Sequence, residues 1–168
     1  FDVGPGMCLI DQFCNYTWNK DLDYNSKLSS KGNINQKLLN KLMQHPLIIK
    51  DHPKSMSREN FKIEYLLKLL KNNVISDYDI IRTLVSFTSE AIVYNINKYI
   101  KFSSGTNLII SGGGLNHKIL INELKNKLGL NSIDLFKIKK IHPDCKEAFL
   151  MCVMAVCNQI NLFSNMKK

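Results

Sequence analysis

The sequence predicts an α/β fold in which helices pack on a sheet. The segment at residues 107–111, with three apolar residues at its centre, has the length of a short buried strand. Three consecutive glycines follow it, and a helical pattern of apolar residues begins directly after them. The 168 residues suffice for one domain, or for one large lobe, with a substantial core.

The first part of the chain predicts a turn, a loop and two helices. Residues 1–11 fit a strand end, a Gly-Pro-Gly turn and the start of an apolar helix. The polar residues 15–33 show no periodicity, so we expect a surface loop there. Residues 35–43 place leucines on one helical face, and this helix must end before Pro46.

The longest helix is expected to begin after Ser76 and to run to about Tyr99. The Ser76 side chain can cap its N-terminus, and Asp77 and Asp79 suit the positive end of the helix dipole. A shorter helix precedes it, with apolar side chains at residues 63–70 on one face.

The last part of the chain predicts two helices and a second strand. Asn116 is expected to open a helix, residues 134–138 a strand, and residues 144–163 a closing helix. The apolar run at residues 148–157 indicates that the closing helix is buried. This run is shorter than the roughly 18 residues that a membrane span requires, so we expect no membrane association.

The net charge of +9 raises the possibility of a nucleic-acid-binding protein. Only Arg58 and Arg82 of the 23 basic residues are arginines, however, and the lysines are scattered among Asn and Ile. Basic runs with interleaved aromatic residues are missing. The pattern favours a solvated basic surface and no nucleic-acid partner, with a basic RNA-associated protein as the alternative from another class.

The five cysteines indicate free thiols in a reducing cytoplasm, because their number is odd and no C-x-x-C pair occurs. We expect them to be buried and the protein to be cytoplasmic. The four histidines have no metal-ligand spacing, so no residue is assigned to a metal.

The first motif is Phe1-Asp2-Val3-Gly4-Pro5-Gly6, with Asp11 one turn into the following helix. Glycines let backbone N–H groups approach an anion, and a carboxylate beside them can take a proton from water or order it near a metal. The structural alternative is an Asp side chain that stabilises the turn.

The second motif joins the predicted strand to a helix through Gly112, Gly113 and Gly114, with Asn116 after them. Bare backbone at this point can lie against a flat ligand, and the helix N-terminus adds a positive dipole end. The motif is neither a Walker loop nor G-x-G-x-x-G. A tight strand-to-helix turn without a ligand explains the glycines equally well.

The third motif, at residues 53–61, contains two cations, Lys54 and Arg58. Either could bind a phosphate or a sugar carboxylate, and Arg58 could do so with two parallel hydrogen bonds. Arg58 could equally pair with Glu59. Glu147, at the start of the closing helix, is the remaining acidic candidate, with a surface carboxylate as its ordinary explanation.

Taken in order, these segments resemble the anhydro-N-acetylmuramic acid kinase family. That family carries D-T-G-P-G-N, P-K-S-T-G-R-E-x-F, G-G-G-x-x-N and a late Glu-Ala helix. The chain departs from the pattern at four positions, which are Val3, Met7, Met56 and Ser57.

The resemblance implies a fold and a domain organisation. The chain would be the C-terminal lobe of an actin-like ATPase (ribonuclease H-like) fold, a mixed sheet flanked by helices. The N-terminal lobe of the two-lobed sugar kinase would be missing from this chain, and we expect the chain alone to be inactive. The sequence leaves undecided whether the protein forms a homodimer.

The resemblance also implies a chemistry, in which water opens the 1,6-anhydro bond of the sugar while ATP phosphorylates O6. Asp2 matches the catalytic base, Gly4 and Gly6 the second phosphate loop, and Gly112–Gly114 the adenosine-side loop. ATP and Mg²⁺ are the implied cofactors. The alternatives are another actin-like sugar or acid kinase, and an inactive remnant of a split or decayed gene.

Overall fold

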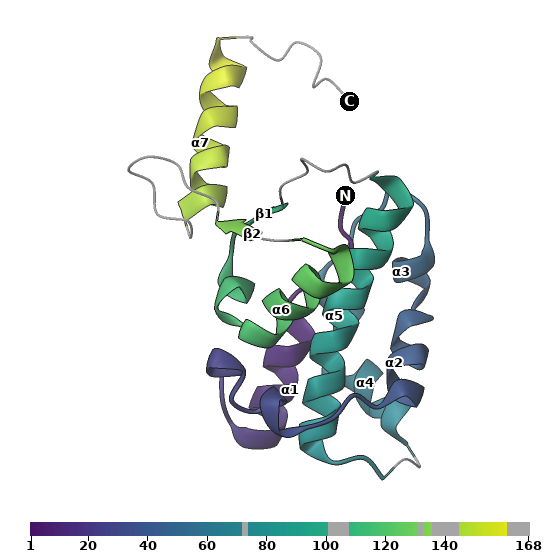
Figure 1. Ribbon diagram of the computed structural model, residues 1–168. Coiled ribbons are helices and arrows are strands. Elements are labelled where there is room, and N and C mark those ends of the chain that lie inside the picture. The colour runs from purple at the N-terminus through teal and green to yellow at the C-terminus, as the bar shows by residue number, and fades with distance from the viewer. Residues whose placement is uncertain (72–73, 101–107, 131–132, 136–144, 161–168) are drawn as a thin grey trace.

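The computed structural model describes residues 1–71, 74–100, 108–130, 133–135 and 145–160. Within them a mostly helical body carries a small sheet, and one further helix projects from the sheet end (Figure 1). The helices are α1 (Cys8–Trp18), α2 (Gln36–Met43), α3 (Pro46–Ile49), α4 (Ile63–Leu70), α5 (Asp77–Tyr99), α6 (Lys118–Leu128) and α7 (Lys146–Gln159). The strands are β1 (Leu108–Ile110) and β2 (Ile133–Leu135).

Helix α5 is the central element, and α1, α2 and α6 all pack against it (Figure 1). It is buried on almost every side between Ile80 and Val93, as is typical of a helix enclosed by others. The predicted cap is confirmed, because Ser76 Oγ accepts a hydrogen bond from the Asp79 backbone N–H at 3.1 Å. The helices predicted at residues 35–43 and 63–70 are confirmed as α2 and α4.

The surface loop expected at residues 15–33 is confirmed only in part: most side chains of residues 19–33 are exposed, but residues 15–18 belong to α1. Helix α1 continues into this segment and ends at Asn19, which adopts a left-handed conformation. Asp23 and Ser29 further along are buried. The Asp23 carboxylate accepts hydrogen bonds from the backbone N–H groups of Leu28, at 2.7 Å, and Ser29, at 3.1 Å. These bonds satisfy the polar groups locally, so a segment without apolar periodicity can still pack against the core.

Gly32 lies directly against the backbone of α5. A Cβ atom at this position would lie 1.9 Å from the Tyr78 carbonyl oxygen, so Gly32→Ala must push the segment away from the helix. We expect the free energy of unfolding to fall by about 1–3 kcal/mol, as for other overpacked sites, in urea unfolding. Gly113→Ala is the control, because a Cβ there meets nothing within 4 Å. Equal stability of both variants would contradict the close approach.

The sheet consists of β1 and β2, which pair in parallel with Leu108 opposite Ile133. The predicted strand at residues 107–111 is confirmed for the described residues, but its predicted burial is wrong, because Ile109 is 59% exposed. The mixed sheet that was expected is not seen within the described part of the chain, where helices predominate and these two parallel strands are the only ones. The second strand, predicted at residues 134–138, is seen at residues 134 and 135 as part of β2, and residues 136–138 lie outside the described part of the chain.

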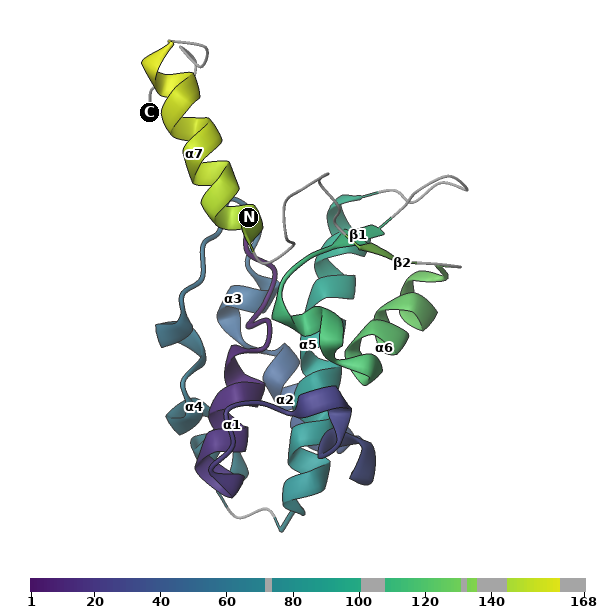
Figure 2. The same ribbon diagram turned by 90° about the vertical axis from the view of Figure 1, so that its left-hand side faces the viewer.

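The closing helix predicted at residues 144–163 forms over Lys146–Gln159, but it is not buried. Residues 144 and 161–163 of the prediction lie outside the described part of the chain. None of the described residues of α7 is buried, and the helix stands away from the helical body (Figure 2). The cysteines follow the same pattern: Cys14 is buried, whereas Cys145 and Cys152 are exposed. Burial, with the nearby carboxylates of Asp23 and Asp11, raises the pKa of the Cys14 thiol to about 12. Among the described helices, none combines the length and apolarity of a membrane span.

Candidate active site

The three motifs meet at one cavity of about 760 Å³, which is within the size range of small-molecule sites. Residues 2–8 of the first motif, 56–58 of the third and 110–114 of the second line it. Thr88 and Ile92 of α5, residues of α6, and Glu147 of α7 complete the wall. Segments that lie far apart in the sequence therefore share one site.

Asp2 connects the first motif to the third. Its Oδ2 accepts hydrogen bonds from the Met56 backbone N–H at 2.7 Å and from Ser55 Oγ at 3.2 Å. Its own backbone N–H donates to the Lys54 carbonyl at 3.4 Å. The residue is exposed, and within the described residues Oδ1 receives no hydrogen bond. The carboxylate is thus fixed through one oxygen while the other stays available to the cavity.

The Gly-Pro-Gly turn packs against α5 at Thr88, Ala91 and Asn95. Thr88 Oγ1 donates to the Gly6 carbonyl at 2.8 Å, and Asn95 Nδ2 donates to the Val3 carbonyl at 3.1 Å. A Cβ at position 4 would lie 2.9 Å from the Ala91 Cβ, and Gly6 has a φ of +58°. Both glycines therefore have structural reasons to be glycine.

The contacts of Thr88, Ala91 and Asn95 with the Gly-Pro-Gly turn were not predicted from the sequence. A signal was present, because small and polar side chains at positions 88, 91 and 95 share one face of the most buried helix.

Gly112–Gly114 join β1 to α6, as predicted, and line the cavity. Gly112 has a φ of +97°, which favours glycine, and a Cβ there would meet nothing within 4 Å. The prediction that Asn116 opens α6 is wrong. A 3-10 turn covers Gly113–Asn116, and α6 begins only after it. The cap is His117, whose Nδ1 accepts from the Leu120 backbone N–H at 3.3 Å. Asn116 instead lines a smaller neighbouring cavity.

The remaining predicted residues divide between the cavity and the core. Arg58 is exposed and Glu147 lies in the first turn of α7, and both line the cavity. Lys54 does not line it, since its Nζ is buried and donates to the Ile48 carbonyl at 2.9 Å. Burial, with the nearby charge of Lys98, lowers the pKa of Lys54.

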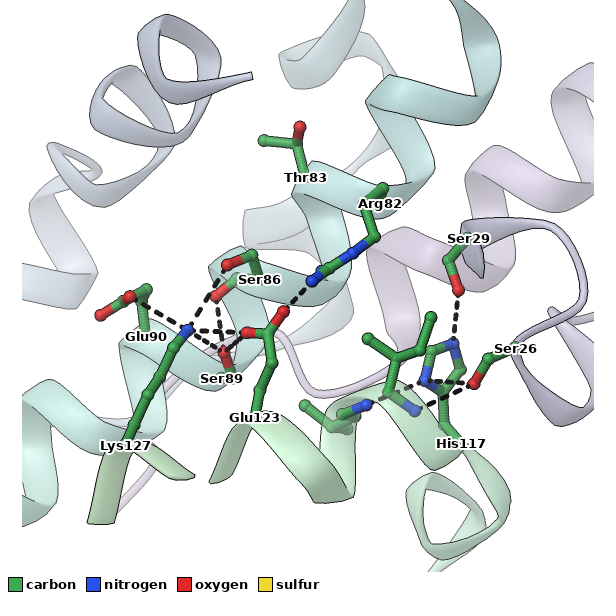
Figure 3. A network of polar contacts seen from close by, with 12 residues as sticks. Ser26, Ser29, Arg82, Thr83, Ser86, Ser89, Glu90, His117, Glu123 and Lys127 are labelled. Carbon is green, nitrogen blue, oxygen red and sulfur yellow. Dashed lines mark hydrogen bonds and ion pairs between the residues drawn. The ribbon is translucent and has the colours of Figure 1, made fainter. Parts of the chain in front are cut away.

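A buried pair holds the second glycine turn to residues 19–33. His117 Nε2 lies 3.0 Å from Asp23 Oδ2. His117 Nδ1 lies 3.1 Å from Ser26 Oγ (Figure 3). Burial alone would raise the pKa of Asp23, but hydrogen bonds from His117, Ser29 and two backbone N–H groups lower it to about 2. The segment that follows Gly112–Gly114 is therefore anchored by a carboxylate that stays ionised.

A second network fixes α6 against α5. Glu123 lies between Arg82, at 2.5 Å, and Lys127, at 2.7 Å, and Ser89 also donates to it (Figure 3). Glu90 pairs with Lys127 at 3.0 Å. Two cations and two carboxylates thus balance at the interface between the two helices, both of which contribute residues to the cavity wall.

A metal cage built by the protein is not present in the described part of the chain, where no three His, Cys, Asp or Glu side chains gather as ion ligands would. The cavity offers carboxylates, one exposed arginine and backbone N–H groups at glycine turns. This set suits an anionic ligand that brings its own cation.

The glycine turns, the carboxylate beside one of them and the helix that follows the other form a concave site of the kind that suits a small anionic molecule. The entire chain, residues 1–168, matches the family model described as Anhydro-N-acetylmuramic acid kinase. The chain belongs to this family, and the resemblance predicted from its motifs is confirmed.

Curated relatives carry the same description. An anhydro-N-acetylmuramic acid kinase of Clostridioides difficile (strain 630) is 36% identical over 168 residues, which cover 98% of this chain and 44% of the relative. The enzyme of Vibrio vulnificus (strain YJ016) is 28% identical over 166 residues, with coverages of 99% and 45%. That of a Bacillus cereus strain is 31% identical over 159 residues, with 92% and 42%. The chain spans less than half the length of these relatives.

Proposed function

We propose that the full-length protein is an ATP-dependent kinase of anhydro-N-acetylmuramic acid, with this chain as the C-terminal lobe of its actin-like fold. One observation carries the proposal: the three motifs that resemble the family converge on one cavity. The product is N-acetylmuramic acid 6-phosphate, which places the enzyme in the recycling of peptidoglycan sugars.

In the proposed reaction Asp2 takes a proton from water, and the water oxygen forms a bond to C1 of the sugar. The bond between C1 and the bridging oxygen, O6, breaks. O6 then receives the γ-phosphoryl group of ATP, and ADP is released. The arrangement of the carboxylate supports this role. Oδ2 is held by Met56 and Ser55, so Oδ1 can face the attacking water without a change of side-chain orientation.

The glycine turns are proposed to hold the nucleotide. Gly4 and Gly6 would contact phosphates, while Gly112–Gly114 and Asn116 would lie on the adenosine side. The open space around Gly112, where a Cβ would meet no atom, supports a close approach of ligand to backbone. Arg58 and Glu147 are proposed to contact the sugar, and Lys54 is left out because its Nζ is bonded in the core.

Mg²⁺ would accompany ATP, because phosphates supply much of its coordination in such enzymes and the protein adds one or two carboxylates. The cavity wall suits an ion that arrives with the nucleotide better than an ion held by protein side chains alone, because no cluster of three metal-binding side chains is found among the described residues. Asp2, Asp11 and Glu147 are the carboxylates of the cavity wall that could add a ligand. Bound Mg²⁺ would neutralise charge that develops on the transferred phosphoryl group.

The test measures sugar-dependent ADP release by the full-length protein. Anhydro-N-acetylmuramic acid should support turnover, whereas N-acetylmuramic acid, which has no anhydro bond, should not. The 168-residue chain alone is expected to show no turnover, because phosphoryl transfer depends on groups from both sides of the nucleotide. Turnover with N-acetylmuramic acid alone would favour a different actin-like sugar kinase, and turnover by the lone chain would contradict the two-lobed site.

A further inference from the structure

Asp11, in the first turn of α1, borders three neighbouring cavities at once. One is the candidate active site. The second extends toward Arg58 and Glu59, and the third toward Asn116 and His117. Asp11 therefore belongs to the wall that these three cavities share.

The Asp11 carboxylate has an unmet hydrogen-bonding requirement. Its Oδ1 is buried and receives no hydrogen bond within the described part of the chain, which is rare for a buried polar atom. Burial raises the pKa of Asp11, while the charges of Arg58 and His117 oppose that rise. The helix N-terminus also favours the ionised form. A buried acceptor without a donor weakens the free protein, so it calls for a reason beyond folding.

A donor that arrives with a ligand supplies that reason. We propose that Asp11 is a ligand-binding residue, which accepts a hydrogen bond from a hydroxyl or amide N–H of a molecule whose anionic group lies toward Arg58. The inference rests on the proposed function. ATP, with ribose hydroxyls and phosphates, and the anhydro sugar, with hydroxyl, amide and carboxylate groups, both have this chemistry.

The experiment measures binding of two probes to the full-length protein by calorimetry. The probes are ADP, in EDTA and again with Mg²⁺, and anhydro-N-acetylmuramic acid. Asp11→Ala removes the acceptor, so the affinity for one probe should fall about 10- to 100-fold, the range for a hydrogen bond to a charged group. Asp11→Asn keeps one acceptor and should recover part of the loss. Which probe is affected identifies the source of the donor.

The thermal midpoint of the ligand-free protein separates binding from a structural role. Because Oδ1 is unpaired in the free protein, the midpoint of Asp11→Ala should stay level or rise. Glu59→Ala is the control, since Glu59 lies on the adjoining cavity, is exposed and pairs with Lys62. It should leave both affinities unchanged.

Three results would overturn the inference while the proposed function stands. These are unchanged affinity for both probes in Asp11→Ala, a lowered midpoint with both affinities reduced alike, and an effect on ADP that appears only with Mg²⁺. The last would mean that Asp11 acts through the ion. Wild-type protein that binds neither probe would overturn the proposed function, and this inference with it.

Discussion

Asp2→Asn in the full-length protein is expected to lower turnover by about 10²- to 10⁴-fold, the usual cost of losing a general base. Asparagine retains an acceptor oxygen for the Met56 N–H and Ser55 hydroxyl, so the geometry of the first and third motifs should persist. ADP affinity and the thermal midpoint should therefore change little. Turnover, ADP affinity and midpoint are measured on one preparation.

The alternative is that Asp2 only stabilises the turn, since Oδ2 already bridges two segments. In that case the midpoint and ADP affinity would fall together, with a modest loss of turnover. Asp21→Asn is the matched control, because Asp21 is exposed and lies outside the cavity. Near-normal turnover of Asp2→Asn would rule out the base assignment.

Glu123→Ala is expected to reduce the free energy of unfolding by about 3 kcal/mol, because it leaves Arg82 and Lys127 facing each other without their shared carboxylate. Burial alone would raise the pKa of Glu123, but hydrogen bonds from Lys127, Ser89 and Arg82, together with the charge of Lys127, lower it from its ordinary value. This contribution is therefore fully present above pH 4.5 and is lost as the pH falls through the folded-state pKa.

Urea unfolding at neutral and acidic pH measures this effect, and hydrogen exchange of α6 amides localises it. Glu90→Ala is the control. Glu90 also pairs with Lys127, but its side chain is 38% exposed, so its loss should cost less than about 1 kcal/mol. Equal costs for both variants, or a Glu123→Ala cost that persists unchanged at low pH, would contradict the network.

Local signals predicted the helical part of the fold well. Ser76 caps α5 as expected, and the three leucines of α2 and Leu66 of α4 are buried in the core, because apolar periodicity indicates which side of a helix is buried. The short helix α3 was missed, since Pro46 marked the end of one helix and is also well suited to the first turn of the next.

Long-range polar contacts were beyond the sequence. Residues 19–33 carry no periodicity, yet Asp23 is buried because its partner His117 comes from a turn 94 positions away. The burial predicted for β1 and α7 failed for the opposite reason: apolar composition shows that a segment can be buried, not that this chain supplies the covering surface. The motifs contain most of the residues that line the cavity, whereas Thr88, Ala91 and Asn95 were found only from the fold.

The central claim is that this cavity serves a kinase in which water opens an anhydro bond. Mass spectrometry of the product made by the full-length protein from ATP and anhydro-N-acetylmuramic acid tests it directly. The expected product is heavier than the sugar by one water and one HPO₃ unit, because the water oxygen joins C1 while O6 takes the phosphoryl group. A product that carries HPO₃ without water, or no phosphorylated product, would contradict the account.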